Sequence, residues 1–215
     1  MVMLQLLSAL SADMCVACDE VVVAASGTRL CEACAAEVPA RVRFRAPGKL
    51  PEAVTEAAAL GSYAGACGAM VRRAKYGRDE ALARHLARQL AEASLDLDAP
   101  DVVVAVPSAR LRAWWRGLAL PELLAGEVAR AHGVSVGRPL ARRRWRAQAG
   151  LAHRARASNA RGAFVAARGG AAGLEGAHVL LIDDVLTTGA TVSACAVGLL
   201  GAGASRVDVL TFAAS

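Results

Sequence analysis

The amino-acid sequence predicts an α/β fold with a mainly parallel sheet, preceded by a small cysteine-bearing module. Short aliphatic and β-branched runs alternate with stretches of helical periodicity, as in chains that build parallel sheets through helical crossovers. The runs are apolar throughout, which is typical of strands buried on both faces. The length of 215 residues and the hydrophobic content of 55% suffice for a buried core and exclude a wholly disordered chain.

The first element is defined by two cysteine pairs, Cys15-x2-Cys18 and Cys31-x2-Cys34. Two such pairs supply four soft ligands, which in a reducing compartment favours a tetrahedral zinc site over disulfides. Four cysteines leave no open coordination position, so we expect structural zinc. A redox CxxC motif is the alternative. Residues 21–30 predict a hairpin between the pairs, and residues 1–45 are therefore expected to form a zinc-ribbon-like module.

A linker and a helix come next. Residues 39–51 contain three prolines, which predicts a connection to a second domain over residues 46–215. Within that domain an amphipathic helix is expected to begin after an N-cap at Asp79. Its leucines recur every four residues as far as Leu90, which places them on one face of the helix.

Strands and helices then alternate along the chain. A β-branched run ending at Pro107 predicts a buried strand. Helical spacing returns over residues 120–128, and Gly133 provides a stop signal. Residues 179–182 and 206–212 are further aliphatic runs. Right-handed crossovers between these strands imply a mainly parallel sheet.

The positive charge is concentrated in one segment, residues 138–161. This segment carries eight arginines and no acid, whereas the whole chain has a net charge of +6. Arginine binds phosphate oxygens in a bidentate manner, and Trp145 offers a base a stacking surface. We expect contact with a polyphosphate or with single-stranded nucleic acid, and a solvated surface loop is the alternative.

Two acids and a hydroxyl-rich turn follow the run at residues 179–182. Asp183 and Asp184 end this strand, and residues 187–191 open the next helix. Open α/β sheets bind ligands at this edge, and N–H groups at a helix N-terminus suit a phosphate. Carboxylates beside a phosphate repel it unless they bind sugar hydroxyls or a cation, so a phosphorylated ribose fits both parts. The sequence has neither a P-loop nor a G-x-G-x-x-G motif after a strand.

The string from Val179 to Thr191 closely resembles the thirteen-residue phosphoribosyl-pyrophosphate (PRPP) motif of type I phosphoribosyltransferases. The resemblance implies a sheet of the type I phosphoribosyltransferase kind, with Asp183 and Asp184 as the catalytic pair on the ribose hydroxyls. It places the 5′-phosphate on Thr187, Thr188, Gly189, Ala190 and Thr191. It also implies that a loop containing Pro107, Ser108 and Arg110 wraps the pyrophosphate, with Mg2+ as cofactor.

Over nearly the whole chain, the order of motifs resembles the ComF (GntX-like) family, which is linked to DNA uptake by competent bacteria. The shared motifs include the cysteine pairs, Lys75-Tyr76-Gly77, Val106-Pro107 and Arg116-Gly117. The chain departs from the family at Leu118-Ala119-Leu120, where relatives usually read Phe-Asn-Gln and therefore carry two more polar groups.

By the same resemblance, the arginine-rich segment takes the position of the mobile hood loop that closes over PRPP. Its candidate contacts with PRPP or nucleic acid are Arg142, Arg143, Arg144, Arg146, Gln148, Arg156 and Asn159.

Two functions remain open. The first is a phosphoribosyltransferase that binds PRPP, or another phosphoribosyl compound, with Mg2+ and releases pyrophosphate, linked to DNA uptake in competence. The second is a non-catalytic phosphoribosyl- and single-stranded-DNA-binding component of a DNA-uptake or DNA-processing complex, with a competence helicase as partner. No apolar stretch reaches the ~20 residues that span a bilayer, and the N-terminus lacks signal-peptide features. We therefore expect a cytoplasmic protein without membrane insertion.

Overall fold

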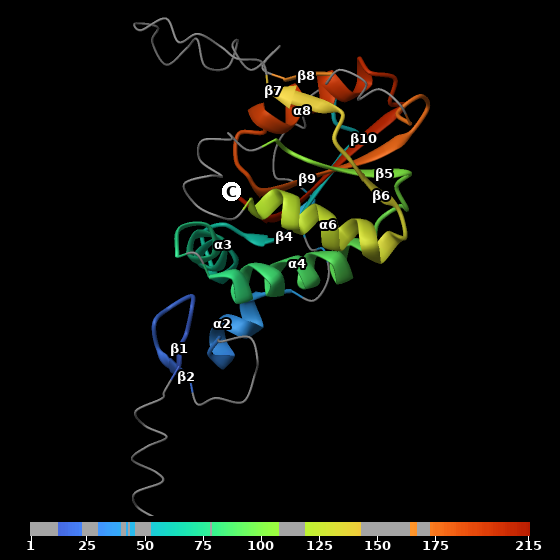
Figure 1. The fold of residues 1–215 in the computed structure, drawn as a ribbon. Helices are drawn as coiled ribbons and strands as arrows, with labels where there is room; N and C mark the ends of the chain where they lie inside the picture. The colour runs from blue at the N-terminus through green and yellow to red at the C-terminus, as the bar shows by residue number, and fades with distance from the viewer. Residues whose placement is uncertain are drawn as a thin grey trace, which may run out of the picture.

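A six-stranded sheet forms the centre of the structure, a computed structural model (Figure 1). The structure describes residues 13–22, 30–39, 42, 44–45, 53–77, 79–107, 119–142, 164–166 and 173–215. The sheet order is β3-β4-β10-β9-β5-β6. Its strands are β3 (Phe44–Arg45), β4 (Glu56–Ser62), β5 (Val102–Ala105), β6 (Ser135–Gly137), β9 (His178–Leu186) and β10 (Arg206–Ala214).

Neighbouring strands of this described sheet run parallel, except that β3 is antiparallel to β4. The predicted fold class, α/β with a mainly parallel sheet, is thus confirmed, and an acid pair near the carboxyl end of β9 is followed by a turn and a helix.

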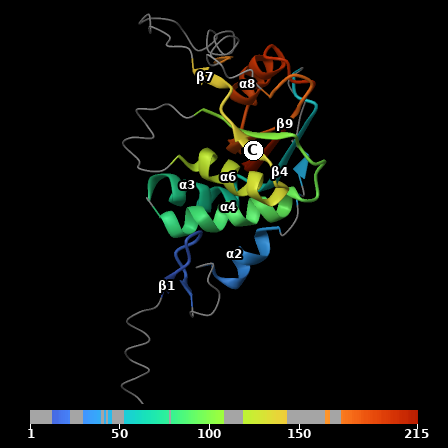
Figure 2. The ribbon, with the colours of Figure 1, turned by 45° about the vertical axis from the view of Figure 1, so that its right-hand side comes forward.

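Helices cover both faces of the sheet (Figures 1 and 2). The helices α3 (Ala66–Tyr76), α4 (Glu80–Ser94) and α6 (Leu120–His132) lie on one side, and α8 (Ala190–Leu200) lies on the other. Near α8, β7 (Leu140–Arg142) and β8 (Phe164–Ala166) form an antiparallel pair. Leu180 and Ile182 of β9 pack in one core cluster, and Val179 and Leu181 pack in the other. Burial on both faces explains why this strand is apolar at consecutive positions.

The predicted start and stop signals lie at the observed helix ends. Asp79 Oδ1 accepts a hydrogen bond of 3.0 Å from the backbone N–H of Leu82, which caps α4. Gly133 ends α6 in the left-handed conformation, with φ of 68°, where glycine is favoured because it lacks a Cβ atom.

The cysteine-bearing module lies beyond α3 and α4, on the side away from the sheet (Figures 1 and 2). It contains β1 (Asp13–Met14), β2 (Val21–Val22) and α2 (Glu32–Glu37). Of the predicted hairpin over residues 21–30, Val21 and Val22 form a strand, but this strand pairs with β1. Residues 23–29 lie outside the described residues. The boundary between residues 1–45 and 46–215 stays a prediction. Among the described helices, none has the length and apolar character needed to cross a bilayer.

Candidate functional site

The predicted acid pair lies where the crossovers of the chain change direction. After β5 the chain continues to β6 on one side, and after β9 it continues to β10 on the other, although β5 and β9 are neighbours. Ligands of open α/β sheets bind at such a switch point, beyond the carboxyl ends of the strands. Ala105, the last residue of β5, is opposite Ile182, so Asp183 and Asp184 extend past the end of the neighbouring strand.

Asp184 forms an ion pair with a lysine from the helical layer. Its Oδ2 atom lies 2.7 Å from Nζ of Lys75, and the two side chains are 8% and 24% exposed. Partial burial reduces solvent screening, so this attraction is stronger than that of a surface pair. The sequence places Lys75 in a family motif without assigning it a role. Only the packing of α3 against the sheet brings Lys75 to the acid pair.

Asp183 has a different environment from its neighbour. Burial raises the pKa of Asp183 and the negative charge of Asp184 raises it further, to about 7, although the backbone N–H of Asp184 and the charge of Lys75 oppose the change. The backbone N–H of Asp184 donates to Asp183 Oδ1 at 2.9 Å. Near neutral pH, Asp183 can therefore either donate or accept a proton, and such a group can bind a sugar hydroxyl in either role.

The turn after β9 has the geometry that the sequence predicts. Gly189 is the N-cap of α8 and has φ of 73°, a conformation that strains residues with a side chain. Thr187, Thr188 and Thr191 are exposed, and Ala190 is half-buried. Because the first N–H groups of a helix lack partners within the helix, this exposed end suits an anion. Phosphate binding by these residues stays a prediction.

The predicted pyrophosphate loop and hood loop are described only in part. Pro107 is half-buried and directly follows Val106, whose N–H donates to the Ile182 carbonyl at 2.8 Å. Pro107 thus lies at the carboxyl edge, beside β9. Arg142 ends β7, but its side chain is not described. The predicted residues Ser108, Arg110, Arg143, Arg144, Arg146, Gln148, Arg156 and Asn159 lie outside the described residues.

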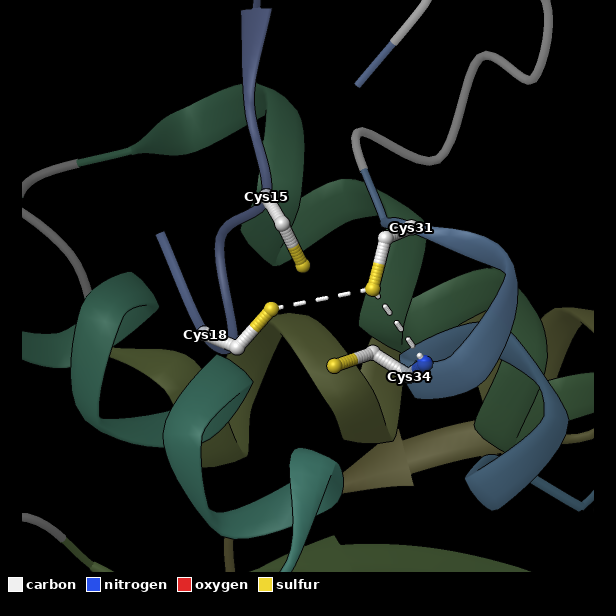
Figure 3. A group of neighbouring side chains, drawn as sticks. All are labelled: Cys15, Cys18, Cys31 and Cys34. Atoms are coloured by element: carbon white, nitrogen blue, oxygen red, sulfur yellow. Dashed lines mark hydrogen bonds between the residues drawn. The ribbon is translucent and has the colours of Figure 1, made fainter. Parts of the chain in front are cut away.

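The four predicted zinc ligands meet in space, and their sulfur atoms point toward one another (Figure 3). Cys15 and Cys18 lie between β1 and β2, whereas Cys31 and Cys34 lie at the start of α2. All four sulfur atoms are within 4.8 Å of one another, and those of Cys18 and Cys31 are 3.6 Å apart. A tetrahedral zinc with bonds of ~2.3 Å requires sulfurs about 3.8 Å apart. The cluster therefore has the size that one ion needs.

The thiols of this cluster do not ionise equally. Burial acts to raise the pKa of Cys15, but backbone N–H groups of Cys31, Ala17 and Cys18 outweigh it and lower the pKa to about 6. Burial raises the pKa of Cys34, and the neighbouring thiols raise it further. One thiolate is thus favoured by the fold, whereas additional thiolates repel one another. A bound cation would remove this repulsion, and the donor set therefore fits zinc.

Charged residues also meet at the opposite, amino-terminal edge of the sheet. Asp208 Oδ1 accepts from the Glu56 N–H at 3.1 Å and from Arg206 Nε at 3.2 Å. Asp208 Oδ2 lies 2.9 Å from His178 Nε2 and 2.7 Å from Arg206 Nη2. Arg206 Nη1 also contacts Asp98 at 2.8 Å. These groups satisfy one another and join the starts of three strands.

Comparisons with known proteins add to this geometry. No family model matches the chain. Part of it is similar to two solved structures, each with a TM-score of 0.40 and covering 60% of this chain and 25% of the other. One is the glutamine PRPP amidotransferase from B. subtilis complexed with ADP and GMP, at 25% identity. The other, described as the allosteric regulatory enzyme of purine biosynthesis, is 23% identical.

Curated relatives are more similar in sequence. The chain is 32% identical over 158 residues to the DNA utilization protein YhgH of Escherichia coli K12, covering 70% of this chain and 68% of that protein. The protein of the same name from Salmonella typhimurium is 34% identical over 148 residues, covering 65% and 63% respectively. The chain therefore belongs to the family of the DNA utilization protein YhgH, a ComF-like family.

Proposed function

We propose that the protein binds PRPP at the carboxyl edge of its sheet and transfers the phosphoribosyl group to an acceptor, with release of pyrophosphate. The observation that carries this proposal is the joint position of the acid pair, Lys75 and the exposed turn at residues 187–191, beside the switch point of the sheet. The relatives of this protein are named DNA utilization proteins, which supports a role for the activity in DNA uptake.

In this proposal, different residues of the site bind different parts of PRPP. N–H groups and hydroxyls of the turn hold the 5′-phosphate, and Asp183 and Asp184 hold the two ribose hydroxyls. Lys75 stabilises the charge of Asp184. Without this cation, two adjacent carboxylates near a phosphate would repel the ligand. The turn and the acid pair thus lie at one edge of the sheet, and Lys75 offsets the charge of Asp184 there.

The reaction requires no nucleophile from the protein. The acceptor forms a bond to C1 of the ribose, the bond from C1 to the pyrophosphate oxygen breaks, and the acceptor loses its proton. Mg2+, bound together with PRPP, would neutralise the charge that develops on the pyrophosphate. The loop containing Pro107, Ser108 and Arg110 would supply further donors to that charge.

Calorimetric titration with PRPP and Mg2+ tests the proposal. We expect saturable binding by the wild-type protein and at least about tenfold weaker binding by Asp184→Asn, because charge-assisted hydrogen bonds to the ribose are lost. Asp98→Asn is the matched control, since Asp98 is 70% exposed and contacts Arg206 at the other edge of the sheet. Absence of binding by the wild-type protein at millimolar PRPP would contradict the proposal.

The name of the relatives favours a second function, a DNA-binding component that retains the phosphoribosyl ligand without transferring it. It would act with single-stranded DNA and a helicase. Affinity for single strands should then fall with salt at a log–log slope of about −0.7 for each phosphate contacted. Replacing Arg142, Arg143 and Arg144 by alanine should reduce the slope by about two units. An unchanged slope would exclude these arginines as the contact. PRPP binding without pyrophosphate release would favour this second function.

We also propose that the cysteine cluster holds structural zinc. Protein purified without chelator should contain about one equivalent of zinc, and Cys34→Ser should lose it because four thiolates are needed to close the site. Cys195→Ser is the control, because Cys195 is buried in α8, on the other side of the sheet. Less than about half an equivalent in the wild-type protein would count against zinc.

A further inference from the structure

We propose that the four-cysteine module positions Lys75 at the acid pair by holding α3 at both ends, so that loss of the metal weakens ligand binding at a distance. The effect on the ligand rests on the proposed function, whereas the effect on Lys75 does not. Helix α3 lies between the module and the sheet (Figures 1 and 2). Its last turn carries Lys75, which contacts Asp184.

The first contact caps the N-terminus of α3. Glu37 Oε2 accepts a hydrogen bond of 2.9 Å from the backbone N–H of Ala66. Gly65 occupies the N-cap position of α3 and offers no side chain, so a carboxylate of α2 supplies the acceptor that an N-cap side chain usually provides. A Cβ atom at position 65 would lie 2.7 Å from Glu37 Oε2. Glycine therefore allows this close approach.

The second contact lies near the other end of the helix. Asp19 Oδ1 is 3.4 Å from Arg73 Nη1, two residues before Lys75. This pair is exposed and contributes little alone. Packing supports it, because Val16 of the module and Met70 and Val71 of α3 belong to one buried cluster.

Each contact comes from a different cysteine pair. Asp19 directly follows Cys18, and Glu37 lies three residues after Cys34 on the same short helix. A single ion bound to all four sulfur atoms would therefore join both contacts at one point. Without the ion, the two pairs are free to separate, and α3 loses a common support.

On the sheet side, α3 has little room to adjust. A Cβ atom on Gly68 would lie 1.8 Å from the carbonyl oxygen of Tyr63, so the first turn packs directly on the backbone that follows β4. If the contacts with the module are lost, the last turn of α3, which contains Lys75, is then the part of the helix that can shift most easily. This is why we expect the Lys75 contact with Asp184 to respond to the module.

The reactivity of the Lys75 amine tests the proposal without any ligand. The chain has only two lysines, Lys49 and Lys75, so limited acetylation followed by mass spectrometry can compare the two amines directly. In Glu37→Gln, the amide oxygen can still accept the hydrogen bond, but the negative charge at the helix N-terminus is lost. We therefore expect acetylation of Lys75 relative to Lys49 to rise about twofold to fivefold. Glu32→Gln, an exposed acid on the same helix, should leave the ratio unchanged.

Removal of the metal by a chelator should raise the same ratio. The thiol of Cys195, which is 0% exposed and lies on the far side of the sheet, reports whether the rest of the protein remains folded. If Cys195 becomes reactive, the Glu37→Gln comparison alone decides. An unchanged Lys75 ratio in Glu37→Gln, with Cys195 protected, would overturn the proposal.

PRPP binding separates this inference from the proposed function. Weaker PRPP binding by Glu37→Gln than by Glu32→Gln would support both. If the wild-type protein does not bind PRPP but the Lys75 ratio still rises in Glu37→Gln, the positioning role stands and the proposed ligand is wrong. If PRPP binds equally to both variants, the module does not control ligand affinity, and that part of the inference fails.

Discussion

Each end of the parallel sheet holds a buried aspartate. The two aspartates differ in how many described groups contact their carboxylates. At the amino end, Asp208 is 7% exposed and contacts the Glu56 N–H, the Arg206 guanidinium and the His178 ring. At the carboxyl end, Asp184 is 6% exposed, and its described ion pair is with one lysine. A carboxylate with all of its partners in place stabilises a fold, whereas a partly buried acid pair beside an exposed turn is suited to bind a ligand.

The comparison predicts that similar substitutions have different effects on stability and ligand binding at the two ends of the sheet. Changes at the amino end should lower the stability of the protein without affecting ligand binding. Changes at the carboxyl end should alter ligand binding, with small or even favourable effects on stability. Three tests, made with single substitutions and their controls, examine this contrast.

The largest effect on stability is expected from Asp208→Asn. The amide cannot neutralise Arg206, whose side chain is 31% exposed, so we expect a loss of about 3 kcal/mol in the free energy of unfolding. Urea denaturation measures it. Asp98→Asn, which removes only the exposed partner of Arg206, should cost less than about 1 kcal/mol. Similar losses in both variants would show that the network at this end is not cooperative.

A pH-dependent effect is expected from Asp183→Asn. The pKa of Asp183 is raised to about 7 by burial and by the charge of Asp184, above the value of about 4 in an unfolded chain. The folded protein therefore holds a proton that the unfolded chain releases between these values. The stability that this proton provides is complete below about pH 4 and is lost as the pH rises through about 7.

Replacing Asp183 by asparagine removes this dependence. Between pH 5 and pH 8, the free energy of unfolding should fall by about 1 to 3 kcal/mol less in the variant than in the wild-type protein. Urea denaturation at the two pH values measures the difference. An identical decrease in both proteins would contradict the assignment of the raised pKa to this group.

A small effect on stability is expected from a pair of glycine substitutions. Gly189 and Gly133 both have left-handed backbone conformations, with φ of 73° and 68°. Alanine at either position should cost about 1 kcal/mol, measured by thermal or urea unfolding. Only Gly189→Ala should weaken PRPP binding, because Gly133 lies at the end of α6. Equal PRPP affinity in the two variants would exclude the turn as the phosphate site.

Much of the fold could be predicted from the sequence, because its signals are local. The β-branched run before Pro107, the cap at Asp79 and the stop at Gly133 each depend on a few neighbouring residues. Strand β4 was not predicted. Its segment, residues 56–62, contains three alanines, which have a weak preference for strands, and it is a strand because it pairs with β3 and β10. Helix α3, which follows it, was also not predicted.

The candidate site also combines features that local sequence patterns predict with contacts between distant segments. The acid pair, the glycine turn and the cysteine spacing are contiguous patterns, and the sequence by itself determined their positions because each pattern lies within a few residues. The role of Lys75 was not predictable, since its partner Asp184 is far away in the sequence. The cap that Glu37 places on α3 and the saturation of Asp208 also join distant segments. Only the tertiary structure decided these contacts, because they depend on the strand order and on how the helices pack against the sheet.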